Sequence, residues 1–548
     1  MFVLPPVTSH PVILARKLLQ LALCIQQLDP TFDRSSLEMG LSPSEAGEEY
    51  FNLASHTVTC HEEFLDSLEG LECLIYEGVY LVNCGSLRRA LVCLRRASTL
   101  AQFMGFHRKG LHKAVYQHDP STRVSGYFTW THIAYLERYI SLLLGLPTSI
   151  TRVQFASAEK PAVQTHTEWL EKVQIDICDH IIDRNQRGDY DLEATQFIDN
   201  TLNKAANSIP AKWWAPMEVR QGMCPNEVMS RVITAQLQIV HYNLLTVLHL
   251  PYLLRNPGGS QIDYSKTTCL YASREVLNRF ITFRSIVRIV FCCRIVDFCA
   301  FTAAMTLLVA HLCQQGGNSS PWLLTHQRLG DRALIVRTIE TLEELHRQNH
   351  DELSLETAKL ARKLLDLEEE SADVGDTYNC VLAEHQNESR EGHASRSLYL
   401  RIPYFGTIRL MPDVSLPAPT SHTAFAGSFH SDNPVGPPGP DFSTASSSLP
   451  SDVFKESNSI EEQVAAQASG QGLQLMQGTD IAVTMDQTFA HLDGGFGSFD
   501  PYDVAMPDIM ASADDWAFQG VDTAFFDSLI NGRTTDQGGR DEGWTGMN

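Results

Sequence analysis

Hydrophobic residues between about positions 10 and 367 recur every three or four residues, and the alternation typical of strands is rare. Over residues 86–104 they form one apolar face, which Gly105 terminates; its members are Leu87, Ala90, Leu91, Leu94, Ala97 and Ala101. This pattern predicts an all-α domain over residues 1–370, built as an irregular helical bundle.

Further helices are predicted from the same spacing. An apolar stripe over residues 130–144 ends at a Gly-Leu-Pro terminator, and another over residues 233–248 closes at Pro251. Residues 296–312 are apolar almost all round, but the uninterrupted run is shorter than the roughly 20 residues that a membrane span needs. A buried helix is therefore predicted there, with no membrane contact. Two more helices are predicted over residues 333–345 and 354–367.

The composition changes after about residue 370. Residues 411–548 contain ten prolines and 20 acidic against 3 basic residues, a net charge of −17, whereas residues 1–410 hold 45 acidic and 39 basic residues, a net charge of −6. Low hydrophobic density with charge of one sign does not offset the entropy of ordering a chain, so a long disordered acidic tail is predicted. Residues 371–410 are expected to form a partly ordered extension.

The tail contains an acidic and aromatic segment, residues 514–530, without a basic residue. Asp522 is able to cap a short helix near 522–531, and such a helix folds only against a partner surface. Its side chains are those that contact hydrophobic grooves on coactivators, and its carboxylates keep the free form soluble. The alternative is a clasp that docks back on the chain's own domain. The candidate activation residues are Trp516, Phe518, Phe525, Phe526, Leu529 and Ile530.

Two motifs on the predicted helices carry charge inside apolar surroundings. Glu137 and Arg138 lie within an apolar stripe, which predicts a buried ion pair joining helices or, less favoured, a pair that reads a ligand. Four arginines at positions 88, 89, 95 and 96 repeat seven residues apart. This spacing favours a solvated outer helix face over a stripe that contacts phosphates.

No motif of an enzyme or of a metal site stands out. The chain has no Gly-rich phosphate loop, no G-x-S-x-G and no D-D-x-x-D, so no catalytic residue is assigned and a helical enzyme is the disfavoured reading. His346 and His350 have helical metal-binding spacing but no evident third ligand, so surface histidines are favoured and no metal residue is assigned. The 13 cysteines are scattered, several of them in apolar runs, which favours reduced core thiols.

Five segments in order resemble the regulatory domain of fungal-specific transcription factors of the zinc-cluster family. They cover parts of roughly residues 10–410 and lie at residues 85–108, 130–147, 249–255, 297–304 and 402–408. The resemblance implies a nuclear transcription regulator, expected to be an activator of a metabolic or secondary-metabolite gene set. Its helical domain would serve dimerisation, autoinhibition or effector sensing, and its tail would recruit the transcription coactivator machinery.

The sequence departs from that family in one respect. No C-x2-C pair occurs, so the binuclear zinc cluster of the family has no counterpart here, no cofactor is expected and no DNA-binding residue is assigned. Contact with DNA is then expected only through a missing N-terminal domain or through a partner in a homo- or heterodimer. The alternative function is a DNA-binding-deficient helical adaptor that heterodimerises with another regulator.

Overall fold

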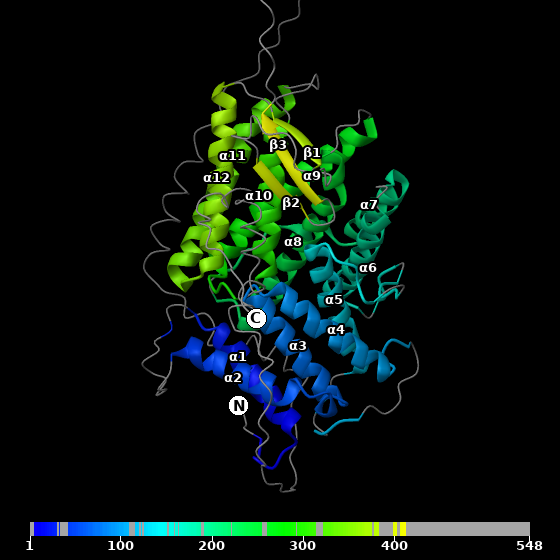
Figure 1. Ribbon diagram of the computed structural model, residues 1–548. Helices are drawn as coiled ribbons and strands as arrows, with labels where there is room; N and C mark the ends of the chain where they lie inside the picture. Colours follow the sequence, from blue (N-terminus) through cyan, green and yellow to red (C-terminus); the bar gives the residue numbers. More distant parts are fainter. Residues whose placement is uncertain are drawn as a thin grey trace, which may run out of the picture. The chain divides into compact units, whose positions relative to one another are not determined.

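The elements of the computed structural model follow one another as helices up to residue 374 and as three short strands after it (Figure 1). The structure describes residues 5–29, 32, 42–108, 116–119, 122, 125–150, 153–157, 159–162, 164–187, 191–220, 222–254, 260–291, 293–313, 322–374, 378–382, 398–402 and 406–412. Of the predicted acidic tail, residues 411–548, the structure describes only residues 411–412, which end the last strand, and the candidate activation segment 514–530 lies outside the described residues.

The part of the chain that the structure describes is mostly helical and contains twelve α-helices, which confirms the predicted all-α class. They are α1 (Pro11–Gln26), α2 (Pro43–Ala54), α3 (Leu68–Asn83), α4 (Leu87–Phe103), α5 (Gly126–Leu144), α6 (His166–Arg187), α7 (Leu192–Asn207), α8 (Pro225–Leu254), α9 (Ser260–Ile286), α10 (Ile295–Cys313), α11 (Trp322–Asn349) and α12 (Glu352–Val374).

The predicted stops at α4 and α5 coincide with glycines in the left-handed region. Gly105 follows α4 with φ 85°, and Gly145 follows α5 with φ 69°. Because such a φ strains residues that carry a Cβ, glycine is the residue that ends these helices most readily.

Two helix predictions needed correction. α8 does not end at Pro251 but continues to Leu254, because Tyr252 is buried and its hydroxyl lies 2.8 Å from the Thr195 hydroxyl of α7. A proline in a last turn removes only one hydrogen bond, so packing of the next residue is enough to extend the helix. The second correction concerns residues 188–229, whose mixed pattern of polar and apolar residues predicts a loop packed on the core, whereas the structure forms helix α7 over Leu192–Asn207 within them.

Three strands form a small antiparallel sheet that the hydrophobic pattern did not predict. They are β1 (Tyr378–Leu382), β2 (Leu398–Ile402) and β3 (Gly406–Pro412), in the order β1-β3-β2. Tyr378 pairs with Pro412, and Leu398 pairs with Leu410. The strands belong to the stretch expected to be a partly ordered extension, and β1 lies against α10.

Consecutive helices pack mainly on their neighbours. α8 and α9 form the most extensive pair, α11 packs on α12, and α10 contacts α8, α9 and α12 (Figure 1). Of the apolar window Ile295–Leu312 in α10, 83% is buried, as predicted for a core helix.

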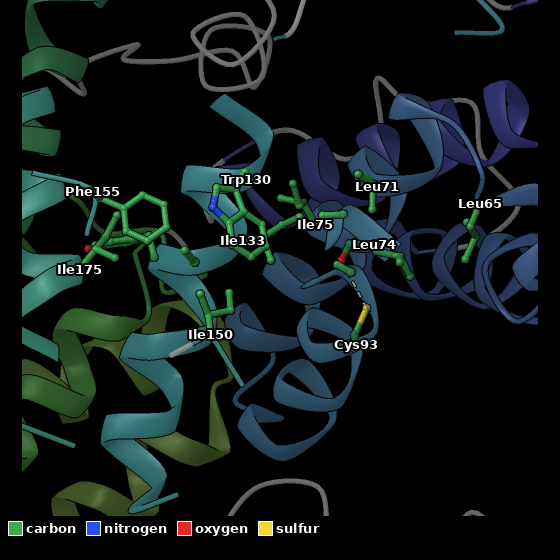
Figure 2. Close-up of a cluster of buried hydrophobic side chains, with 14 residues drawn as sticks. Leu65, Leu71, Leu74, Ile75, Cys93, Trp130, Ile133, Ile150, Phe155 and Ile175 are labelled. Carbon is green, nitrogen blue, oxygen red and sulfur yellow. Dashed lines mark hydrogen bonds between the residues drawn. The ribbon is translucent and has the colours of Figure 1, made fainter. Parts of the chain in front are cut away.

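One hydrophobic cluster joins α3, α4, α5 and α6 (Figure 2). Trp130 and Ile133 of α5 lie at its centre, between Leu74 of α3 and Ile175 of α6. The Cys93 thiol of α4 donates to the Leu74 carbonyl at 3.3 Å, so even this buried polar group is satisfied. Burial of such side chains fixes the position of α4 and α5, which carry the charged residues considered next.

Candidate functional site

Glu137 and Arg138 are both fully buried in the middle of α5, but they do not pair with each other. Consecutive residues on a helix point about 100° apart, so the expected mutual pair is replaced by two separate sets of contacts. The Glu137 carboxylate accepts hydrogen bonds from the Thr148 hydroxyl at 2.6 Å and the Ser149 amide at 2.8 Å. It also accepts one from Arg95 Nε at 3.4 Å, which ties α5 to α4.

Arg138 points to a different side of α5, toward α6. Its guanidinium donates at 2.8–3.4 Å to three backbone carbonyls and two carboxylates, those of Ile150, Val153, Ile175, Asp176 and Asp179. Because the five N–H donors are taken up by protein acceptors, this geometry favours a clamp between α5 and α6 over a residue that reads a ligand.

A second buried ionic cluster was not found from the sequence. Arg284 at the end of α9 forms a bidentate pair with Asp297 of α10, with both N–O distances 2.8 Å. Arg294 pairs with Asp351, the residue directly before α12, at 2.8 and 2.5 Å, and lies 3.5 Å from Asp297. We call these four residues the α9–α12 clamp. Arg294 also donates to the Asn83 carbonyl at the end of α3, so the clamp connects the N-terminal helices with the last ones.

Two strained residues lie directly before members of the α9–α12 clamp. Cys293 and His350 are the non-glycine residues with positive φ in the described chain, at 57° and 56°. They precede Arg294 and Asp351, respectively. Such backbone conformations persist only when surrounding contacts hold them, so the buried ion pairs determine the two turns.

His241 of α8 is a neutral buried histidine. Burial, followed by the nearby positive charge of Arg279, lowers the pKa of His241 to about 4. Its ring packs against Trp214, with the centroids 4.8 Å apart, and Arg279 lies over the Tyr242 ring at 4.5 Å. The site therefore tolerates only the uncharged imidazole.

We expect this histidine to make stability depend on pH. A pKa lowered on folding means that the unfolded state binds the proton more tightly, so the contribution is present above about pH 6.5 and is lost as the pH falls toward 4. Between pH 7 and pH 5 the loss amounts to about 2 kcal/mol. Urea unfolding at both pH values measures it, and His241→Gln should reduce the pH difference by that amount. An unchanged difference in the variant contradicts the assignment.

The outer face of α4 exposes Arg88 and Arg89, as predicted. Arg95 and Arg96 are instead partly buried and bond backbone carbonyls, those of Pro147 at 2.6 Å and Thr59 at 2.7 Å. Phe103, on the last turn of the same helix, is 82% exposed, which the helical pattern did not indicate.

The other predicted and possible sites show no convergent chemistry. His346 Nδ1 lies 3.0 Å from the Asp351 carbonyl, and His350 lies one residue beyond α11. Among the described residues no three His, Cys, Asp or Glu side chains gather as a metal ion requires. A cavity of about 420 Å³ is lined by Arg274 and Asp331, which pair with each other at 2.6 Å. The candidate activation residues lie outside the described chain and therefore have no place in this geometry.

Comparison with known proteins gives consistent relatives. The chain is 34% identical to the dehydrocurvularin biosynthesis regulator of Alternaria cinerariae, in an alignment of 585 positions that covers 97% of this chain and 74% of that protein. It is 35% identical to the transcription factor sdnS of Sordaria araneosa (98% and 70% covered) and 30% identical to the probable transcription factor gsfR1 of Penicillium aethiopicum (96% and 74%). No protein-family model matches, and no solved structure is significantly similar.

Proposed function

This chain belongs to the family of these fungal transcription factors and biosynthesis regulators, and from that premise we propose that it activates transcription of a secondary-metabolite gene set. The matches extend over nearly all of this chain, so they include the helical domain and are not limited to one motif. We further propose that it belongs to the zinc-cluster branch of such regulators, that it acts in the nucleus and that it is not an enzyme. The relatives are named as regulators, and these names support a regulatory role and not an enzymatic one.

The observation that carries the activator proposal is the charge and aromatic pattern of residues 514–530. Six bulky apolar side chains alternate there with carboxylates and no basic residue, at the end of a tail with net charge −17. Segments of this kind bind hydrophobic grooves of coactivators, and their acidic residues favour association with basic partner surfaces. The proposed partner is therefore the transcription coactivator machinery.

The helical domain supplies the regulatory scaffold in this proposal. The clamp of Arg138 and the α9–α12 clamp bury paired charged groups between helices, so they fix the positions of those helices. We propose that this scaffold forms homo- or heterodimers, and that DNA contact comes from a zinc cluster in an N-terminal domain or from a partner that reads DNA.

Tethering tests the proposal against the alternative, a helical adaptor that heterodimerises with another regulator. The full chain is fused to a heterologous DNA-binding module upstream of a reporter gene. An activator raises the transcript at least several-fold over the module alone, and removal of residues 411–548 returns it to the baseline. An adaptor leaves the reporter at the baseline in both fusions, although it still co-purifies with another regulator.

A further inference from the structure

The exposed side of α4 combines arginines with uncovered apolar side chains. Arg88, Val92, Arg95, Thr99 and Phe103 recur at helical spacing, and we call these five residues the α4 outer face. Val92 is 62% and Phe103 is 82% exposed. The opposite side of the helix is buried against α3 and α5, so these two hydrophobic residues do not contribute to the core.

The charge of α4 is opposite to that of the chain. The helix contains four arginines and no acidic residue, in a protein with a formal net charge of −23. Arg88 and Arg89 are exposed beside Val92. A basic surface that also exposes apolar side chains, here Val92 and Phe103, is complementary to a segment that combines aromatic residues with carboxylates.

We propose that residues 514–530 of the same chain dock on the α4 outer face. In the docked form the aromatic residues of the segment cover Val92 and Phe103, and the flanking aspartates of the segment pair with the arginines of α4. This inference rests on the proposed function in one respect, since it assigns a second partner to the aromatic residues proposed to bind coactivators.

Length supports this occupant. Residues 88–103 of α4 extend over about 24 Å. A segment of 17 residues extends over about 25 Å when wholly helical and farther when part of it is extended, so residues 514–530 are long enough to follow this face. The described chain ends at Pro412, about 100 residues before the segment, and a flexible linker of that length has an end-to-end distance on the order of 50–60 Å. The segment is therefore able to reach α4 at an effective concentration that a free peptide seldom attains.

Docking and coactivator binding exclude each other, because both bury the same rings. A coactivator then has to displace the segment from α4. The apparent affinity of the coactivator equals its affinity for the free segment multiplied by the fraction of chains in which the segment is free. The α4 outer face becomes a regulatory surface, on which loss of positive charge releases the segment.

Photo-crosslinking of the purified full chain tests the docking. Phe103→p-benzoylphenylalanine places the photoreactive ring at the exposed end of α4, and Phe197→p-benzoylphenylalanine is the matched control on α7, where Phe197 is 60% exposed. We expect position 103 to cross-link within one chain to peptides from 514–530, at least tenfold more than position 197. Adding Arg88→Glu and Arg89→Glu should lower the yield several-fold, as should 1 M salt, which screens exposed charges.

Three results overturn the proposal. They are equal yields at positions 103 and 197, cross-links at 103 that do not include residues 514–530, and cross-links between isotope-labelled and unlabelled chains in a mixture. The last result identifies a second copy as the occupant. Circular dichroism verifies that each variant remains folded, and the exposure of the substituted side chains makes this the expected outcome.

The tethered reporter separates this inference from the proposed function. Arg88→Glu with Arg89→Glu should raise the output of the tethered full chain at least twofold, and no rise contradicts masking of the segment by α4. If the segment has no activating ability, the reporter stays at the baseline while the cross-link persists. Failure of one proposal is therefore distinguishable from failure of the other.

Discussion

Asp297→Ala is expected to lower the free energy of unfolding by about 3–5 kcal/mol, because it leaves the buried guanidinium group of Arg284 without its counter-charge. The side chain of Arg284 is 0% exposed and that of Arg294 is 2% exposed. Arg284 loses both of its 2.8 Å contacts, and Arg294 retains only Asp351 as a carboxylate partner. Desolvating a cation that has lost its partner is far more costly than the loss of a contact in water.

Urea unfolding of the full chain measures this effect, with the midpoint and slope compared between variants. The matched control is Arg187→Ala, which removes an exposed partner of Asp183 on α6, where the side chains are 64% and 59% exposed. This control should change stability by less than about 1 kcal/mol. If Asp297→Ala is as mild as the control, the α9–α12 clamp does not hold the helices together.

Phe525→Ala combined with Phe526→Ala is expected to reduce reporter output of the tethered full chain at least tenfold. Aromatic residues that bind in hydrophobic grooves contribute about 2 kcal/mol or more each when truncated, and about 1.4 kcal/mol corresponds to a factor of ten. The two rings are adjacent on the predicted apolar helix face, so both are lost from the same contact.

The tail offers its own control for that variant. Phe425 and Phe429 lie in a stretch without an acidic residue between Asp413 and Asp432. Phe425→Ala combined with Phe429→Ala removes the same number of rings and should leave the output unchanged. Equal losses in the two variants mean that overall aromatic content, and not the acidic segment, carries activation.

Local periodicity was sufficient to predict much of the helical fold. The boundaries of α4 and the burial of α10 follow from spacings of three and four residues and from glycines at the ends, which are properties of short stretches. The extension of α8 past Pro251 depends on the contact of Tyr252 with α7, and such a contact between distant residues leaves no local signal. The small sheet was missed because its strands have five to seven residues and pair across intervening segments.

The charged residues likewise divide into features that the local sequence predicts and features that depend on distant contacts. Burial of Glu137 and Arg138 was predictable because they interrupt an apolar stripe, but their partners were not, since those are set by the turn after α5 and by the position of α6. The α9–α12 clamp pairs Arg294 with Asp351, which lie 57 residues apart, and nothing in a single sequence indicates that these two residues pair. The exposure of Phe103 was equally unpredictable from periodicity, because an aromatic residue at the end of an amphipathic helix is more often covered.

The most direct measurement of the central claim uses the tail alone. Residues 411–548 are fused to a heterologous DNA-binding module, and the reporter transcript is measured at matched protein levels beside the module without the tail. The account predicts that the fusion raises the transcript at least several-fold and that the fusion carrying Phe525→Ala and Phe526→Ala does not. A transcript that stays at the level of the module alone, with the fusion protein present in the nucleus, contradicts the account.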